Sequence, residues 1–240
     1  MKLLALESSG LVASVAITED GNLLGEYTMN YKKTHSQTLL PMLQALTEMI
    51  ELDLSTIDAI AVSKGPGSFT GLRIGSATAK GLGLALNKPI IPVPTIDAMA
   101  QNLWGTDKLI CPMMDARRQQ TYTGLYEFVD GKLQTVLQQC AVDISEITAK
   151  INELGRTVIV LGDGVPVFEQ YLDEHLAVPY EKAPATCNRQ RAASVAALAE
   201  VLYQEGVVES AAEHKPDYLR LSQAERELAE RDSVGRDFSV

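Results

Sequence analysis

Residues 57–75 read IDAIAVSKGPGSFTGLRIG, in which an apolar run leads directly into a glycine-rich loop. The run from Ile57 to Ser63 is short and contains β-branched residues, as expected for a strand that is buried on both faces. We predict a helix over residues 72–86, directly behind the loop. Because glycines allow other atoms to come close to the backbone, this segment sets how the first half of the chain packs.

The same loop is a candidate phosphate site, because the amino-terminus of a helix offers free N–H groups and a favourable dipole. Its spacing differs from the known phosphate motifs: no Gly-Lys-Ser or Gly-Lys-Thr follows, and Gly71 comes one residue late for G-x-G-x-x-G. A tight turn that only shapes a surface is the alternative. The candidate residues of this loop and of the neighbouring cleft are Glu7, Ser8, Gly65, Gly67, Ser68, Thr70, Gly71, Arg73 and Asp115.

The composition is that of an ordinary globular protein, with 46% hydrophobic and 22% charged residues in 240. With 21 basic and 31 acidic residues the net charge is −10, so we expect any contact with RNA to run through a partner. Three widely spaced cysteines predict neither a disulfide framework nor a zinc site. We find no signal peptide core and no apolar run that could span a bilayer, which predicts a cytoplasmic protein with no membrane contact.

One order of elements occurs twice along the chain. Each half reads as a strand ending in an acidic residue, a second strand, an Asp-Gly turn, a third strand, a helix, a further strand and a glycine loop. The predicted strands cover residues 3–6, 12–17, 23–29, 57–63, 109–114, 121–128, 133–142 and 157–161, and the predicted helices cover 36–51, 72–86, 144–154 and 192–203. The repeat predicts an α/β protein of two ribonuclease-H-like lobes, each with a mixed sheet flanked by helices, on the plan of actin, sugar kinases and Hsp70.

The predicted boundary between the lobes lies in the segment that holds Pro89, Pro92 and Pro94, because proline cannot donate to a sheet ladder. We therefore predict a first lobe over residues 1–98, which carries partner-docking helices, and a second lobe over 99–221. Residues 222–240 form a charged tail.

Glu7 and Asp115 occupy matching ends of the first strand of each half. Two carboxylates across a cleft could bind magnesium or act as acid and base, whereas the favoured alternative is that each caps a turn. His35 lacks a second ligand one helical turn away, where Leu39 stands, so no local metal pair is expected. We expect His175 and His214 to be surface residues, and we expect no cofactor.

The helix after the loop carries Gly71, Gly75, Ala79 and Gly83 at intervals of four residues. Glycine inside a helix costs about 1 kcal/mol relative to alanine, so this strip predicts close approach of another element. That element is either the first helix of the same lobe or another subunit. The candidate interface residues are Leu39, Leu43, Leu46, Leu72, Gly75, Ala79, Leu82 and Gly83.

Several segments together resemble the bacterial TsaB family, also called YeaZ, over nearly the whole chain to about Arg220. The most specific of them is the run from Gly65 to Gly75. The others are Leu4-Ala5-Leu6-Glu7-Ser8-Ser9, His35-Ser36-Gln37, Leu39-Leu40-Pro41, Asp115-Ala116-Arg117-Arg118 and Pro216-Asp217-Tyr218-Leu219-Arg220.

The resemblance implies a non-catalytic subunit of the machinery that makes threonylcarbamoyladenosine at position 37 of tRNA. It implies pairing with a TsaD-like catalytic paralogue through the first two helices, a homodimer when that partner is absent, and a TsaE-like ATPase as a third component. Glu7 stands where the family usually has aspartate, and the tail from Ser222 onward lies outside the resemblance. The alternative function is an ATP-dependent phosphotransferase of the sugar-kinase type, and a metalloprotease is suggested only by older naming of the family.

Overall fold

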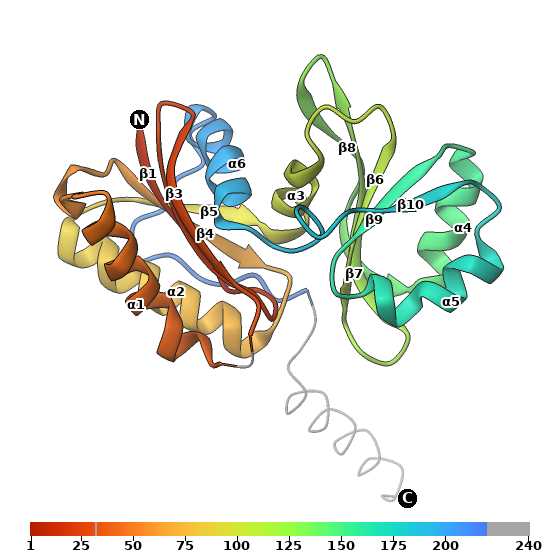
Figure 1. Cartoon of the computed structure of the whole chain (residues 1–240), viewed down its shortest axis with the longest axis horizontal. Helices are drawn as coiled ribbons and strands as arrows, with labels where there is room; N and C mark the ends of the chain where they lie inside the picture. The colour runs from red at the N-terminus through yellow and green to blue at the C-terminus, as the bar shows by residue number, and fades with distance from the viewer. Residues whose placement is uncertain (32, 220–240) are drawn as a thin grey trace, which may run out of the picture.

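The computed structural model describes residues 1–31 and 33–219, which form two lobes side by side (Figure 1). The first lobe is built on a five-stranded sheet in the order β3-β2-β1-β4-β5. Its strands are β1 (Lys2–Glu7), β2 (Ala13–Glu19), β3 (Asn22–Met29), β4 (Ala59–Gly65) and β5 (Ile90–Pro94). The central strand β1 pairs antiparallel with β2 and parallel with β4, so the sheet is mixed.

The second lobe repeats this plan in a five-stranded sheet of order β10-β9-β6-β7-β8. Its strands are β6 (Leu109–Asp115), β7 (Gln120–Val129), β8 (Lys132–Asp143), β9 (Val158–Leu161) and β10 (Tyr180–Lys182). Strand β6 again pairs antiparallel with the strand that follows it and parallel with β9. Because the same pairing order occurs twice, the predicted duplication of mixed-sheet lobes is confirmed.

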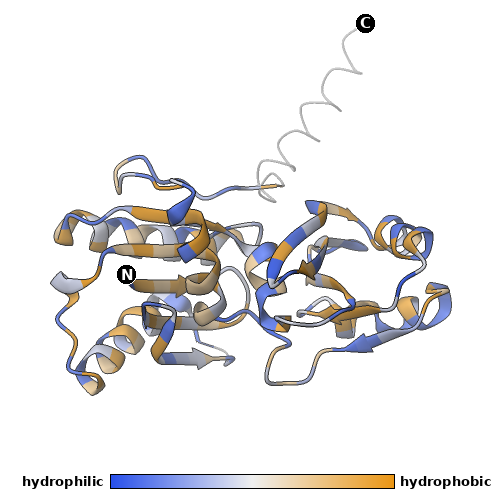
Figure 2. Ribbon diagram, turned by 90° about the horizontal axis from the view of Figure 1, so that it is seen from above, coloured by the Kyte–Doolittle hydropathy of each residue, from blue (hydrophilic) through white to orange (hydrophobic). Residues whose placement is uncertain are grey.

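Helices cover both faces of the first sheet. They are α1 (His35–Met49) and α2 (Phe69–Leu86) on one face and α6 (Ala192–Gln204) on the other (Figure 1). Alternate residues of β1 point to opposite faces of the sheet: Leu4 and Leu6 pack with α1, whereas Leu3 and Ala5 pack with α6. Strands that are apolar on both sides are typical of a sheet between two helix layers, and Figure 2 shows the apolar colour concentrated on these strands.

A short helix between the lobes joins their cores. The remaining helices are α3 (Thr95–Ala100), α4 (Ile144–Leu154) and α5 (Val165–His175), with short 3₁₀ turns at Leu54–Thr56 and Gln101–Leu103. In α3, Ala98 packs into the first core, while Ile96 and Met99 pack into the second. The hydroxyl of Tyr126 in β7 donates a hydrogen bond of 2.6 Å to Asp97 of α3. The two lobes therefore share buried contacts through α3.

The proline-rich segment predicted as a boundary forms strand β5, which contains Pro92 and Pro94. Prolines are tolerated there because β5 is an edge strand, where missing N–H groups do not interrupt a ladder. The sequence pattern also does not predict α3, α5 or β10, which are short or begin at residues that resemble loops. In the part of the chain that the structure describes, no helix has the length and apolar character needed to cross a bilayer.

The chain returns to the first lobe after β10, which differs from the predicted division at residues 99–221. Helix α6 packs on the first sheet, and the segment after it follows the same lobe: Glu209 and Ile90 exchange backbone hydrogen bonds of 2.8 and 2.9 Å. We call residues 205–219 the strap. The alanine-rich face of α6 covers the side of the first sheet opposite α1 and α2, which explains the return. The predicted tail 222–240 lies outside the described residues.

Glu26 of β3 holds the beginning of α6 in place. Its Oε1 accepts a hydrogen bond of 3.0 Å from the Ala193 N–H, and its Oε2 accepts from the guanidinium of Arg191, with 3.1 Å to Nε. The residue before α6, Arg191, makes no side-chain cap of its own. A carboxylate at a helix amino-terminus is favourable, so a residue from a distant strand caps this helix.

We predict that Glu26→Ala lowers the free energy of unfolding by about 2 kcal/mol, because the helix terminus and Arg191 both lose their acceptor. As the control, Glu19→Ala removes the exposed partner of Lys2, which lies 3.2 Å away, and should cost less than about 0.5 kcal/mol. Urea unfolding followed by circular dichroism measures both variants. Equal losses for the two variants would contradict the capping role of Glu26.

Candidate functional site

A cavity of about 500 Å³ lies between the two lobes. On the side of the first lobe it is lined by the loop after β1, Ser9–Leu11, and by the beginning of α2, Gly67–Phe69. On the side of the second lobe it is lined by the end of β6, Met114–Arg117, and by Asp163. The end of the strap, Asp217–Leu219, completes the lining. The glycine loops of both halves therefore meet at one cavity.

The residues predicted for a phosphate loop or cleft fall into three groups. Those that line the cavity are Gly67, Ser68 and Asp115. Those that are buried in the first lobe and do not line it are Glu7, Ser8, Gly65 and Gly71. Those that are exposed on the outer side of α2 are Thr70 and Arg73. The structure thus brings only a third of the predicted set to the cavity.

The carboxylate of Glu7 is fully engaged inside the first lobe. Its Oε1 accepts hydrogen bonds from the Ser9 N–H at 2.6 Å and from the Ser9 hydroxyl at 2.5 Å. Its Oε2 accepts a hydrogen bond from the hydroxyl of Ser63 in the neighbouring strand β4. Burial raises the pKa of Glu7, while the hydrogen bonds from Ser63 and Ser9 oppose that rise. Glu7 therefore fixes the turn after β1 and offers no oxygen to the cavity.

Asp115 caps the equivalent turn in the second lobe. Its Oδ1 accepts a hydrogen bond of 2.8 Å from the Arg117 N–H, and its Oδ2 lies 3.0 Å from the Arg117 guanidinium. The next residues, Arg117, Arg118 and Gln119, have φ values of 66°, 54° and 63°. Each such left-handed residue costs on the order of 1 kcal/mol, so the surrounding contacts hold the turn in place. Glu7 and Asp115 both cap turns, as the favoured alternative predicts, and they do not face each other across a cleft.

Asp163 lies between two glycines after β9 and lines the cavity. Burial raises the pKa of its carboxyl group, with Asp115 adding to the rise and Arg189 and Arg117 opposing it. Among the described residues that line the cavity there are thus three carboxylates, those of Asp115, Asp163 and Asp217, and one guanidinium, that of Arg117, which is paired with Asp115. This part of the lining therefore supplies little positive charge for a polyphosphate.

The strip of small residues on α2 packs against the chain's own backbone. A Cβ atom added to Gly71 would lie 2.0 Å from the carbonyl oxygen of Ser8, and one added to Gly75 would lie 2.3 Å from the Ser8 Oγ. A Cβ added to Gly83 would lie 2.9 Å from that of Ala211 in the strap. The close approach predicted from the strip is present, and its neighbours are the loop after β1 and the strap.

The burial of the strip changes which residues can meet a partner. Of the residues predicted for the interface, those buried within the chain are Leu39, Leu43, Leu46, Leu72, Gly75, Ala79 and Gly83, and Leu82 is half-buried. These residues build the first core because α1 and α2 turn their apolar sides toward the sheet. We call the exposed side of the two helices the α1–α2 face; its residues are Ser36, Gln37, Leu40, Pro41, Gln44, Glu48 and Met49 of α1 and Thr70, Arg73, Ala77, Gly81, Leu84 and Ala85 of α2.

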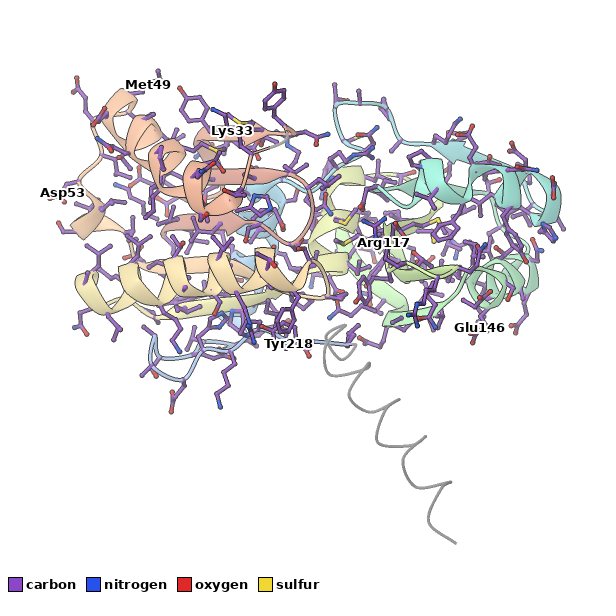
Figure 3. The ribbon with its side chains drawn as sticks, turned by 90° about the horizontal axis from the view of Figure 1, so that it is seen from below. Lys33, Met49, Asp53, Arg117, Glu146 and Tyr218 are labelled. Carbon is purple, nitrogen blue, oxygen red and sulfur yellow. The ribbon has the colours of Figure 1, made fainter. Side chains whose placement is uncertain are left out.

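The strap runs along α2 and ends at the cavity. The Nζ of Lys80 donates hydrogen bonds of 3.1 and 3.0 Å to the carbonyl oxygens of Ala212 and His214. Further along, the N–H of Asp217 donates to the carbonyl oxygen of Lys64 at 2.6 Å. Figure 3 shows the strap below α2 and Tyr218 beside the first turn of this helix. The strap thereby links one side of α2 to the lining of the cavity.

The three histidines play structural roles in the described chain. The Nε2 of His35 lies 2.8 Å from the carbonyl oxygen of Gly10, which can only accept, so this nitrogen carries the proton. His175 is exposed, as predicted. The prediction for His214 is wrong: the ring is buried, and its Nδ1 lies 2.9 Å from a Glu209 carboxylate oxygen. Among the described residues, no group of three or more His, Cys, Asp or Glu side chains could hold a metal ion.

Sequence reasoning missed the aromatic part of the cavity, namely Phe69, Tyr122 and Tyr218. Tyr218 comes from a segment that the predicted division assigns to the other lobe, and no local pattern indicates its return. The sequence does carry a signal for Asp163, because this residue stands in the second glycine loop that the repeat reveals.

Comparisons with known proteins agree with this architecture. Residues 22–228 match the family model described as TsaD, tRNA N6-adenosine threonylcarbamoyltransferase. The tRNA threonylcarbamoyladenosine biosynthesis protein TsaB of Bacillus subtilis (strain 168) is 32% identical over 233 residues, which cover 96% of this chain and 99% of the relative. The TsaB protein of Haemophilus influenzae is 28% identical over 92% of this chain and 94% of its own.

A solved structure from Pseudomonas aeruginosa, named YeaZ, superposes with a TM-score of 0.75 at 26% identity and covers 91% of this chain and 99% of that chain. An inorganic polyphosphate/ATP-glucomannokinase from Arthrobacter superposes with a TM-score of 0.50 at 12% identity, over 85% of this chain and 99% of that chain, which shows a shared fold alone. The predicted relation to the fold of sugar kinases is therefore confirmed.

We predict that Gly75→Ala destabilises the protein by about 1–3 kcal/mol, because the new methyl group would meet the Ser8 Oγ. Gly81→Ala in the same helix is the matched control: apart from the helix's own backbone, no atom of residues 1–31 and 33–219 lies within 4 Å of a Cβ there, so the variant should gain up to about 1 kcal/mol of stability. Thermal and urea unfolding measure both. Because Ser8→Ala by itself removes the hydrogen bond to the Gly71 carbonyl, the comparison is a double-mutant cycle: Gly75→Ala should cost less in the Ser8→Ala background than in the parent, and an equal cost in both backgrounds would contradict this contact.

The raised pKa of Glu7 predicts a stability that depends on pH. Because folding favours the protonated form, the contribution of Glu7 is fully present below its unfolded pKa near 4.5 and is lost as pH rises through the raised folded pKa. The cost of Glu7→Gln should therefore shrink with rising pH, by at most about 1.4 kcal/mol per pH unit. Urea unfolding between pH 4 and 8 measures this difference, and a constant difference across that range would contradict the shift.

Proposed function

The chain belongs to the TsaB (YeaZ) family, and we propose that it acts in tRNA threonylcarbamoyladenosine biosynthesis as a non-catalytic subunit. In this proposal it binds a TsaD-like catalytic paralogue, a TsaE-like ATPase joins the pair, and tRNA meets the chain only through the assembly. Without the paralogue, the surface that would bind it joins two copies of the chain in a homodimer. The names of the TsaB relatives support the pathway, and the contacts of Glu7 and Ser8 support the non-catalytic role.

The engagement of Glu7 is the observation that carries the proposal. Within residues 1–31 and 33–219 its hydrogen bonds go to Ser9 and Ser63 of the same lobe, so the acidic residue at the end of the first strand closes a turn. The atoms of Ser8 fill the space beside Gly71 and Gly75, where a helix amino-terminus would otherwise approach a phosphate. Residues that could serve chemistry are thus used to hold the fold together.

An ATP-dependent phosphotransferase is the second candidate, and the cavity of about 500 Å³ is the observation that favours it. A volume of this size suits a small ligand. Its described lining nevertheless holds a single cation, Arg117, which is paired with Asp115, and therefore supplies little positive charge to a polyphosphate. The charge of the cavity therefore favours the non-catalytic subunit over the kinase.

The α1–α2 face suits a protein partner. Leu84 is 65% exposed and Leu40 is 51% exposed, although both stand on helices of a well-packed lobe. The exposed residues of α2 that precede Leu84 include two small ones, Ala77 and Gly81, at successive turns. Small side chains allow another helix to come close, and exposed leucines supply apolar area to bury.

We predict that Leu84→Asp weakens binding of the TsaD-like paralogue by about 30-fold or more, because a carboxylate would be buried in the contact. Val201→Asp on α6 is the matched control, since Val201 is also an exposed apolar helix residue but lies on the opposite face of the first sheet. Isothermal titration calorimetry measures affinity, and a tRNA modification assay with and without the chain measures function. Both variants should unfold within about 0.5 kcal/mol of the parent.

Three results would contradict the proposal. The first is a tRNA modification rate that does not depend on this chain. The second is equal affinity of Leu84→Asp and Val201→Asp for the paralogue. The third is binding of ATP and magnesium by the chain alone at millimolar concentration or better, which would favour the phosphotransferase.

A further inference from the structure

The exposed side chain of Arg73 contacts two aromatic side chains, and we call these three residues the stack. Its guanidinium carbon lies 4.0 Å from the centroid of the Phe69 ring, and its Nε donates a hydrogen bond of 3.3 Å to the Tyr218 hydroxyl. The rings of Phe69 and Tyr218 are in contact, with 4.6 Å between their centroids. The strap holds Tyr218 in position through the hydrogen bond of 2.6 Å from the Asp217 N–H to Lys64. These contacts therefore fix the orientation of the guanidinium plane and occupy the edge that carries Nε.

The stack leaves the other edge of the guanidinium available. Neither terminal nitrogen of Arg73 has a hydrogen-bond or ion-pair partner within residues 1–31 and 33–219, and the side chain is exposed. An arginine whose plane is fixed in advance loses little side-chain entropy when it binds, and its fork matches a carboxylate in a bidentate geometry. The geometry is that of a prepared binding residue.

Apart from Lys80, the other residues of α2 carry no charge. The other exposed residues toward the middle of α2 are Thr70, Ala77, Gly81 and Leu84, and Lys80 is partly buried with its ammonium bound to the strap. A single fixed cation beside small and apolar residues is complementary to a surface that carries one carboxylate among apolar groups. An arginine held against aromatic side chains is also typical of an interface hot spot.

We propose that Arg73 anchors the protein partner by binding an aspartate or glutamate of that partner, with Phe69 and Tyr218 as positioning residues. This inference rests on the proposed function, and it adds the chemistry that the partner must present. It also gives the strap a role, since the strap supplies Tyr218. Because Phe69 and Tyr218 line the cavity, the anchor joins the α1–α2 face to the cavity wall.

A phosphate of RNA is the other anion that a guanidinium binds well. The chain has a net charge of −10, which opposes approach of a polyanion, and the other exposed residues of α2 carry no charge. The surroundings therefore favour a protein carboxylate.

The test measures the affinity of full-length variants for the purified TsaD-like paralogue by isothermal titration calorimetry. Arg73→Ala should weaken binding about 30-fold or more, and Arg73→Lys about tenfold, because lysine keeps the charge but loses the planar fork. Tyr218→Phe should weaken it about threefold, since it keeps the ring and loses only the hydroxyl that orients Nε. Lys132→Ala, an exposed cation at the start of β8, is the control and should bind like the parent.

The salt dependence of the affinity separates the contribution of the ion pair from that of packing. Raising sodium chloride from 50 to 500 mM should weaken the parent more than it weakens Arg73→Ala, because the ion pair is screened only where it exists. Urea unfolding within about 0.5 kcal/mol of the parent confirms that each variant is folded.

The outcomes separate this inference from the proposed function. If the parent chain does not bind the paralogue, both are overturned. If the parent binds and Arg73→Ala binds equally well, the anchor is overturned and the proposed function stands. If Arg73→Ala binds the paralogue normally but the assembled complex loses affinity for tRNA, Arg73 contacts RNA phosphate and the anchor is again overturned.

Discussion

The close packing of α2 against the turn after β1 is the contact on which the rest of the first lobe depends. Gly71 and Gly75 have no side chains, so the carbonyl oxygen and hydroxyl of Ser8 come to within contact distance of the helix. The Ser8 hydroxyl donates to the Gly71 carbonyl at 2.9 Å, which ties strand and helix together. Because the small side of α2 must face inward for this contact, Arg73 and Leu84 are left on the outside. One packing requirement thus determines both the filled turn and the exposed face.

Local sequence patterns predict most of this architecture because strands and helices follow from side-chain periodicity. Apolar runs that end at Glu7 and Asp115, each followed by an Asp-Gly turn further on, are enough to show that the lobe is repeated. The strip from Gly71 to Gly83 likewise predicts that something approaches α2 closely. It cannot say what approaches, since Ser8 and Ala211 are far from the helix in sequence and any small contact would leave the same pattern. The pattern specifies the space, and the fold decides which atoms fill it.

Several features that the sequence does not predict depend on the path of the chain between the lobes. Helix α6 reads as a helix of either lobe, because its alanine-rich side would suit either sheet. Its placement depends on Glu26 and Ser14 in the first sheet, whose side chains bind the first N–H groups of the helix. Once α6 is fixed there, the strap must follow α2, which buries His214 and brings Tyr218 to the cavity. A single crossing therefore accounts for the buried His214 and for Tyr218, which both lines the cavity and contacts Arg73.

The two lobes share a topology, but the acidic residue at the end of the first strand behaves differently in each. In the parallel pair β1–β4, Leu6 lies opposite Val62, so the next residues, Glu7 and Ser63, are neighbours across the strands. The longer side chain of glutamate reaches both this serine and the turn ahead of it, and it stays inside the lobe. Asp115 has one methylene fewer, binds only the turn that follows it, and remains at the cavity. The duplicated fold therefore keeps an acidic residue at the end of the first strand of both lobes. The extra methylene of Glu7 lets its carboxylate hold strand β4 and the turn after β1 together.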